Sequence, residues 1–374
     1  MKAVAVFPAS KEVKLIEQVE PAITRPDQVK LRMLDVGICG TDKEICTFAY
    51  GSLPQGESYL VIGHEALGEV VEVGIDVRGL APGDLVVPTV RRPCPHARCR
   101  PCRAGRPDFC ETGDFLEHGI KGAHGYLSEY VVDDARYMNL VPRDLRHVAV
   151  LVEPLTIAEK AEAQLYGLMQ RRPPWIDPAA TERTIGKGHN ALILGAGPVG
   201  LLGAMAFLSA GFKTWVYSRG RKPDPRIDVA QRIGATYLCA GDVPVCQLST
   251  HIGPIDLVYE AVGHSLLAFE VLRELGPNGI YVLTGVPGKQ KLIEADPAAL
   301  FRDVVLKNQV VLGTVNAGPQ AFAAAIADLQ TFYLRWPAAV SALMDERTPI
   351  DRAVQRILDR PAGIKSIISF PSRE

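Results

Sequence analysis

The sequence lacks a surplus of charge of either sign. Its 374 residues carry 41 Lys and Arg against 42 Asp and Glu, a formal net charge of −1. Proteins that bind nucleic acid usually display a basic surface, which this balance argues against. No apolar run approaches the ~18 residues of a membrane span, and the start, MKAVAVFPASKEVKL, lacks the ~7–15-residue apolar stretch of a secretory signal. We therefore expect a cytoplasmic protein that binds neither nucleic acid nor membrane.

The chain is too long for one ordinary hydrophobic core, because a single core stops growing at ~250–300 residues. Short Val- and Ile-rich runs broken by Gly and Pro, such as YLVIGHEALGEVVEVG, fill the first ~155 residues and are typical of β-strands. From residue 189 the apolar segments NALIL, TWVYSR, IDLVYEAVG and GIYVLTGV follow one another, with helical segments between several of them. This alternation predicts an α/β domain with a doubly wound parallel sheet.

The segment GAGPVG, residues 195–200, has the glycine pattern of a dinucleotide-binding turn. It directly follows the strand ALIL and precedes a helix, which is the context that this otherwise weak motif requires. Gly195 permits a sharp turn, Gly197 lets the backbone approach a pyrophosphate, and Gly200 allows close packing of helix on strand. The helix, which begins at Pro198 and Val199, then presents its partial positive charge to the phosphates.

The end of the next strand indicates which nicotinamide cofactor is bound. A site for NAD places a carboxylate there to accept from the ribose 2′-hydroxyl. This chain instead has Ser218, Arg219 and Arg221, and no carboxylate before Asp224. Arginine can bind a 2′-phosphate, which a carboxylate would repel. The sequence therefore favours NADP over NAD, unless Asp224 takes the acidic role from an unusual loop.

Zinc-type ligands occur in three separate segments of the first part of the chain. GICGTDKE offers Cys39 beside Thr41, VIGHEAL offers His64 and Glu65, and VLVEPLT offers Glu153. A catalytic zinc uses about three protein ligands and keeps one position open. Cys39, His64 and Glu153 would supply three ligands, and Glu65 could orient a ligand or exchange with one. Spacing alone makes this a weak signal, because a lone Cys or His is more often a core residue.

The stretch RRPCPHARCRPCRAGRPDFC, residues 91–110, has four cysteines in the spacing C-x4-C-x2-C-x7-C. Four thiolates around one zinc leave no open position, so such a site is structural rather than catalytic. The stretch has few apolar residues, and a metal would supply the energy that folds it. The first gap leaves room for His96 to replace one ligand, and four reduced thiols without metal are the other alternative. The predicted ligands are Cys94, Cys99, Cys102 and Cys110.

The chain resembles the zinc-dependent medium-chain alcohol and polyol dehydrogenases. GHEALGEVVEVGIDV fits their signature GHExxGxxxxxGxxV, and CGTD, the four-cysteine stretch and GAGPVG come in the family's order. The resemblance implies a GroES-like catalytic domain over residues 1–188, completed by residues 310–374, around a Rossmann domain at 189–309. It also makes Cys39, His64 and Glu153 catalytic zinc ligands with Glu65 adjacent, so that two zinc ions are expected per chain.

Within this family the sequence is most similar to the glucose (aldose 1-) dehydrogenases, through VRRPC, DFCETGDFLEHGIKGAHGYLSEY, EPLTIAEKA and GTVNAG. The resemblance implies that Glu117 and Asn316 bind sugar hydroxyls, with Thr41, Thr89 and Glu153 in the same pocket. It departs at Leu306, where the group has a histidine, and this puts glucose itself in doubt more than the reaction type. Members often form dimers or tetramers, and the strand near GIYVLTGV commonly supplies the dimer edge.

Such a site implies a definite reaction. Zinc acts as a Lewis acid on a substrate hydroxyl, and hydride passes from its carbon to the nicotinamide. For an aldose the reacting hydroxyl is the anomeric one and the product is a lactone, while Glu65 or Thr41 could pass the proton outward.

Three alternatives stay open. The nearest is the same chemistry on another aldose, a polyol or a secondary alcohol. A second alternative is a zinc-independent NADP quinone or enone reductase, which shares the architecture. Such enzymes lack the zinc ligands, so the presence of Cys39, His64 and Glu153 argues against it. A cofactor-sensing binding protein would have a decayed site.

Overall fold

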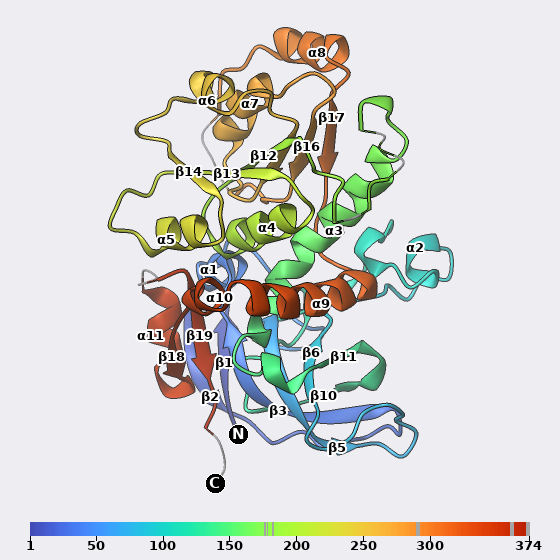
Figure 1. Ribbon diagram of the computed structural model, residues 1–374. Coiled ribbons are helices and arrows are strands. Elements are labelled where there is room, and N and C mark those ends of the chain that lie inside the picture. The colour runs from blue at the N-terminus through green and yellow to red at the C-terminus, as the bar shows by residue number, and fades with distance from the viewer. Residues whose placement is uncertain (176, 178, 182, 289–291, 360–362, 372–374) are drawn as a thin grey trace. The chain divides into compact units, whose positions relative to one another are not determined.

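The computed structural model describes residues 1–175, 177, 179–181, 183–288, 292–359 and 363–371 (Figure 1). The chain divides into two compact units. Unit 1 comprises Met1–Thr156, Asn316–Leu334 and Met344–Glu374, and unit 2 comprises Ile157–Val315 and Arg335–Leu343. The first boundary lies inside helix α3 (Val152–Met169), whereas the sequence places the start of the dinucleotide-binding domain at residue 189. The domain limits stay a prediction.

Unit 1 consists mainly of short strands, as the Val- and Ile-rich runs predict. Its largest sheet has the order β11-β6-β5-β3-β19-β18, with β10 also paired to β3. Two three-stranded sheets have the orders β2-β1-β4 and β7-β8-β9. The strands are β1 (Lys2–Phe7), β2 (Glu12–Glu17), β3 (Gln28–Gly37), β4 (Leu60–Val61), β5 (Glu65–Val73), β6 (Leu85–Pro88), β7 (Arg91–Arg92), β8 (Leu116–His118), β9 (Gly122–Ala123), β10 (Tyr130–Asp134), β11 (Met138–Val141), β18 (Met344–Pro349) and β19 (Lys365–Ser369).

Strand β3 is the centre of this unit, because β5, β10 and β19 all pair with it. Its side chains Leu31 and Met33 are completely buried, which places the core of the unit along this strand. Strand β19 pairs antiparallel with β3, with Ile367 opposite Gly37. The segment GIKSIISF therefore forms the predicted strand and completes a sheet begun more than three hundred residues earlier.

Unit 2 contains the predicted doubly wound sheet. Its six strands are all parallel, in the order β14-β13-β12-β15-β16-β17. Each predicted apolar segment forms one of these strands, so the predicted α/β fold class is confirmed. The strands are β12 (Asn190–Leu194), β13 (Lys213–Ser218), β14 (Thr236–Cys239), β15 (Leu257–Glu260), β16 (Ile280–Leu283) and β17 (Val310–Gly313).

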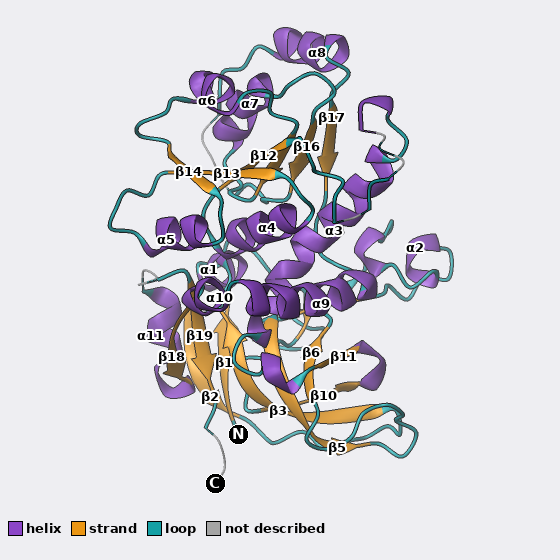
Figure 2. Cartoon of the chain, in the orientation of Figure 1, coloured by secondary structure: helices purple, strands orange, loops and turns teal. Residues whose placement is uncertain are grey.

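Helices cover both faces of this sheet, with α4 and α5 on one side and α6 and α7 on the other (Figure 2). Alternation along β12 explains the two faces, because Leu192 and Leu194 pack against Leu248 of α6 and Val271 of α7. The helices of unit 2 are α4 (Pro198–Ser209), α5 (Pro225–Arg232), α6 (Leu248–Ile252), α7 (Ser265–Glu274), α8 (Pro297–Leu306) and α10 (Pro337–Ala342).

Among the residues that the structure describes, the further α-helices of unit 1 are α1 (Gly40–Cys46), α2 (Arg100–Arg103), α9 (Pro319–Arg335) and α11 (Ala353–Leu358). The Ala-rich segment beginning at Pro319 thus forms the predicted helix. Among the residues that the structure describes, no helix has the length and apolar character needed to cross a membrane.

The strand order shows which strand near GIYVLTGV forms the edge of the sheet. The strand in GIYVLTGV is β16, and it pairs with β15 on one side and β17 on the other. Its backbone groups are therefore already used, so it cannot supply a free edge. The edge strand at this end is β17, which the sequence analysis did not single out.

A buried carboxylate ties strand β18 into unit 1. Asp35 of β3 is almost completely buried, and it accepts from Arg146 at 2.7 Å and from Arg347 of β18 at 3.0 Å. Asp35→Asn keeps the shape but removes the charge that both guanidinium groups face. We expect the free energy of unfolding to fall by about 1–3 kcal/mol, since both arginines are partly exposed and keep some hydration. Denaturant unfolding followed by circular dichroism measures this loss.

Asp27→Asn is the matched control, because the pair of Asp27 with Arg25 is about half exposed on both sides. This variant should lower the free energy of unfolding by less than ~0.5 kcal/mol. An equal effect of the two variants would mean that Asp35 contributes no more than a surface pair.

Candidate active site

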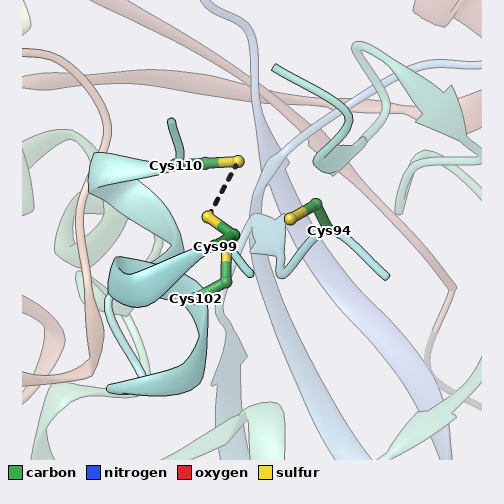
Figure 3. Close-up of side chains that lie close together, drawn as sticks. All are labelled: Cys94, Cys99, Cys102 and Cys110. Carbon is green, nitrogen blue, oxygen red and sulfur yellow. Dashed lines mark hydrogen bonds between the residues drawn. The ribbon is translucent and has the colours of Figure 1, made fainter. Parts of the chain in front are cut away.

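The four predicted cysteines of the 91–110 stretch lie together in the structure. Their sulfur atoms are all within 4.8 Å of one another, and the Sγ atoms of Cys99 and Cys110 are 3.9 Å apart. Figure 3 shows Cys99 and Cys102 at α2, Cys110 at the end of the following short helix Pro107–Phe109, and Cys94 approaching from another segment. All four are free of disulfides. This arrangement fits a closed four-cysteine site for one zinc ion.

The pKa values of two of these thiols are shifted in opposite directions. Burial acts to raise the pKa of Cys110, but hydrogen bonds from Thr112 and Gly113 lower it to about 6. Cys102 goes the other way, because burial raises its pKa to about 12. Neighbouring thiolates repel one another, so they cannot all ionise unless a positive ion is bound among them.

His96 is not part of this cluster. Its Nε2 lies 2.5 Å from Oδ2 of Asp114, and both side chains are exposed. The alternative in which His96 replaces Cys94 is therefore not supported, because Cys94 itself lies among the other three thiols.

A second cluster contains three of the residues predicted for a catalytic zinc. Ligand atoms of Cys39, His64 and Glu65 lie within 4.8 Å of one another. Cys39 immediately precedes α1, His64 immediately precedes β5, and Glu65 is the first residue of that strand. Thiolate, imidazole and carboxylate are the donors that zinc uses in catalytic sites, so the donor set fits this metal.

Asp42 is a positioning residue that the sequence analysis left without a role. It is completely buried, and its carboxylate accepts from the backbone N–H of Cys39 at 2.8 Å and of Gly63 at 3.2 Å. Its Oδ1 also lies 3.3 Å from Nδ1 of His64. A carboxylate behind a histidine fixes the ring and its tautomer, which leaves the other nitrogen for a metal. The signal was present in the CGTD motif.

Lys365 is the second residue that the sequence analysis missed. Its Nζ donates to both oxygens of Glu65, at 2.6 Å to Oε1 and even closer to Oε2, and both side chains are fully buried. Glu65 therefore lies next to Cys39 and His64 but is held by an ion pair. The only available signal was one lysine in the otherwise apolar GIKSIISF.

Glu153 and Thr41 lie near this cluster with less direct roles. Burial raises the pKa of Glu153 to about 7, against the lowering effect of His64. Glu153 stands in the first turn of α3 and is not among the three clustered ligands, so its predicted role as a zinc ligand stays a prediction. The Oγ1 of Thr41 is 3.9 Å from the Sγ of Cys39.

The two predicted sugar-binding residues are in direct contact. The Nδ2 of Asn316 donates to Oε1 of Glu117 at 2.7 Å, although 199 residues separate them in sequence. The side chain of Glu117 is nearly buried. Thr89 is also buried, but its hydroxyl accepts from Asn139 at 3.0 Å. Its predicted place in the pocket stays a prediction.

The glycine turn of unit 2 has the geometry that a dinucleotide requires. Gly195 has a φ of +96°, and a Cβ at Gly200 would lie 2.1 Å from the carbonyl oxygen of Gly195. Gly197 caps α4, and a Cβ there would meet no atom within 4 Å. The start of α4, with Pro198 and Val199, is thus uncrowded beside Gly197, and its predicted role in binding a pyrophosphate stays a prediction.

The two arginines that directly follow β13, Arg219 and Arg221, differ in their contacts. Arg221 donates to Asp242 at 2.6 Å, whereas exposed Arg219 has no partner among the described residues. Ser218 is half-buried at the end of the strand. Asp224 caps α5 by accepting from the N–H of Arg226 at 2.9 Å. Because this carboxylate already accepts a hydrogen bond as the N-cap of α5, the geometry disfavours Asp224 as the acid that would bind the ribose of NAD.

Comparisons with known proteins agree with this picture. The family profile "Alcohol dehydrogenase GroES-like domain" matches residues 25–143, and "Glucose dehydrogenase C-terminus" matches residues 146–370. The chain is 35% identical to the glucose 1-dehydrogenase of Methanocella arvoryzae over 99% of both chains. It is 41% identical to glucose 1-dehydrogenase 2 of Vulcanisaeta moutnovskia over 90% of this chain and 91% of that one.

The chain belongs to the zinc-dependent medium-chain dehydrogenases, in the glucose dehydrogenase group. The solved structures of this group include glucose dehydrogenase of Haloferax mediterranei in complex with NADP, Zn and gluconolactone. That structure matches 100% of both chains at 32% identity with a TM-score of 0.86. Galactitol-1-phosphate dehydrogenase of Escherichia coli, at 20% identity and a TM-score of 0.79, shares the fold.

The two metal clusters of this medium-chain dehydrogenase can be separated by variants. Cys102→Ser removes one of four thiolates, so zinc content should fall from two ions per chain to about one. His96→Ala should keep both ions, because His96 bonds to Asp114 outside the cluster. Elemental analysis of zinc per chain measures both results. Loss of zinc from His96→Ala would show that the histidine is a ligand after all.

Proposed function

We propose that this protein is a glucose 1-dehydrogenase that oxidises D-glucose at the anomeric hydroxyl to the lactone and reduces NADP. The observation that carries the proposal is the Glu117–Asn316 pair, which stands in the same unit as the Cys39, His64 and Glu65 cluster. The names of the relatives and the gluconolactone in the Haloferax mediterranei complex support the same substrate.

Two zinc ions are proposed per chain. Cys39, His64 and Glu153 would hold the catalytic ion, with Glu65 beside it, and Cys94, Cys99, Cys102 and Cys110 would hold the structural ion. When bound, the catalytic zinc supplies a Lewis acid that lowers the pKa of a substrate hydroxyl, and NADP supplies the hydride acceptor.

The protein's own residues position these groups. Asp42 fixes the ring of His64, and the start of α4 together with Arg219 would hold the phosphates of NADP. Thr41 is the better of the two candidates for passing a proton outward, because both oxygens of Glu65 already accept from Lys365. Arg219 rather than Arg221 is proposed as the main partner of the 2′-phosphate, since Asp242 already neutralises Arg221.

Domain limits and assembly are also part of the proposal. Residues 1–188 and 310–374 would form the catalytic domain, and residues 189–309 the cofactor domain. We propose a homodimer or homotetramer that uses the β17 edge and α8, where Phe301, Val305 and Val311 are exposed apolar side chains. Leu306, which departs from the group's histidine, is also largely exposed at the end of α8.

The decisive experiment is a screen of aldoses, polyols and secondary alcohols with NADP and NAD, followed at the absorbance of the reduced nicotinamide. D-Glucose with NADP should give the highest kcat/KM. In the same assay, Cys39→Ser should lower kcat by at least ~10³-fold while the Kd of NADP stays within about twofold, because Cys39 belongs to unit 1 and the glycine turn to unit 2. Near-normal turnover of Cys39→Ser would contradict the assignment of the metal site.

Arg219 sets the cofactor preference under this proposal. Arg219→Ala should raise the KM for NADP ~10- to 100-fold and leave the KM for NAD nearly unchanged, since only NADP has the 2′-phosphate. Arg221→Ala is the matched control and should have a smaller effect, because Arg221 is paired with Asp242. Steady-state kinetics with both cofactors measures the difference. An equal loss for NADP and NAD would place Arg219 outside the 2′-phosphate site.

A further inference from the structure

Two consecutive arginines are buried side by side in β7. A buried guanidinium requires partners, and the two side chains find them in different places. Arg92 donates to Asp133 of β10 at 2.5 Å and to the hydroxyl of Tyr126 at 3.2 Å, so it is anchored to the main sheet of unit 1. Arg91 takes no part in that network and instead contacts Glu117 and the backbone of Pro107 and Asp108.

The guanidinium of Arg91 joins the proposed sugar site to the turn that the four cysteines enclose. Its Nε and Nη2 donate to Oε1 of Glu117 at 3.0 and 2.9 Å. Its Nη1 donates to the carbonyl oxygens of Pro107 and Asp108 at 3.5 and 3.4 Å. These two residues lie between Cys102 and Cys110, in the short helix Pro107–Phe109 that leads directly to Cys110. The ring of Phe115 stacks on the guanidinium at 3.7 Å and holds its plane.

Asn316 is placed on the same turn by a separate contact. Gly318 follows it by two residues, and a Cβ at Gly318 would lie 2.9 Å from Oδ1 of Asp108. The segment that carries Asn316 therefore packs closely on the turn whose carbonyl groups bind Arg91. Both residues proposed to bind sugar are thus linked to this turn, Glu117 through Arg91 and Asn316 through the segment at Gly318.

The hydrogen bonds of Glu117 leave one of its oxygens for a ligand. Oε1 accepts from Nε and Nη2 of Arg91 and from Nδ2 of Asn316. Oε2 accepts from none of the described residues. A carboxylate held through one oxygen presents the other in a fixed direction, as sugar recognition requires.

We propose that the four-cysteine lobe, residues 94–110 with its zinc ion, sets the affinity of the enzyme for its sugar. Arg91 is the positioning residue that links this lobe to Glu117. This inference rests on the proposed function. The stretch 91–110 has few apolar side chains, so its rigidity depends on the bound metal. The carbonyl groups of Pro107 and Asp108 hold the guanidinium of Arg91 through hydrogen bonds, and Arg91 in turn holds the carboxylate of Glu117.

The test compares Arg91→Met and Arg91→Lys with the wild-type holoenzyme. Arg91→Met should raise the KM for D-glucose ~10- to 100-fold, while kcat and the KM for NADP change less than about threefold. Arg91→Lys should lie between, because an ammonium keeps the charge but lacks the planar fork that reaches carboxylate and carbonyls together. Calorimetric titration of D-glucose should show the same loss of affinity, and both variants should retain two zinc ions.

Two further variants keep the test independent of folding. Arg100→Met is the matched control, since Arg100 lies in the same lobe with its side chain almost fully exposed, and it should behave as wild type. Gly318→Ala disturbs the contact with Asp108 without removing a charge, and it should raise the KM for D-glucose several-fold while both zinc ions are retained.

The outcomes separate this inference from the proposed function. If the wild-type enzyme oxidises no aldose, the proposed function fails, and the inference fails with it. If the wild type oxidises glucose but Arg91→Met and Gly318→Ala bind it normally, only the inference is overturned. Equal losses in kcat and in affinity for both substrates, accompanied by loss of zinc, would mean that Arg91 only stabilises the lobe.

Discussion

The buried ion pair of Lys365 and Glu65 is the interaction on which the candidate active site depends. Two charges taken out of water cost several kcal/mol each unless they are paired with good geometry, and here both oxygens of the carboxylate face the ammonium. The pair fixes the start of β5, directly after His64, against a strand from the other end of the chain. The position of the histidine beside Cys39 follows from that attachment.

Carboxylates with defined hydrogen-bond partners organise other parts of the protein in the same way. Asp42 accepts from two backbone N–H groups before it faces His64, and Glu117 accepts from Arg91 and Asn316 through one oxygen only. Asp224 is committed to capping α5. Each acid is held by donors from its own surroundings, so its neighbours keep a defined direction toward a metal, a sugar or a phosphate.

Much of this could be predicted from the sequence, because some of its patterns are local. The apolar strands of unit 2 and the glycine turn follow from residues adjacent in the chain, and the four cysteines lie within seventeen positions. The resemblance to a family supplied Glu117 and Asn316 as sugar-binding residues. Their contact depends on a chain reversal over 199 residues that no local pattern reveals.

The residues that sequence reasoning missed act through distant partners. Lys365 looks like one charged residue in an apolar strand until β19 pairs with β3 and brings it to Glu65. Local patterns also leave open which strand forms the free edge, since strand order in a parallel sheet depends on crossover connections rather than on apolar character. The positioning role proposed for Arg91 likewise depends on its contacts with the turn at Pro107 and Asp108, which only the structure reveals.

The 300 residues between Glu65 and Lys365 also affect how the protein comes to be folded in a cell. At ~5–20 residues per second, a ribosome needs about 15–60 seconds to produce the lysine after the glutamate. During that interval all six strands of the parallel sheet leave the ribosome. Until Lys365 is made, Glu65 lacks the ammonium group that it pairs with in the folded protein. The unit that begins the chain is therefore among the last parts of the protein to be completed.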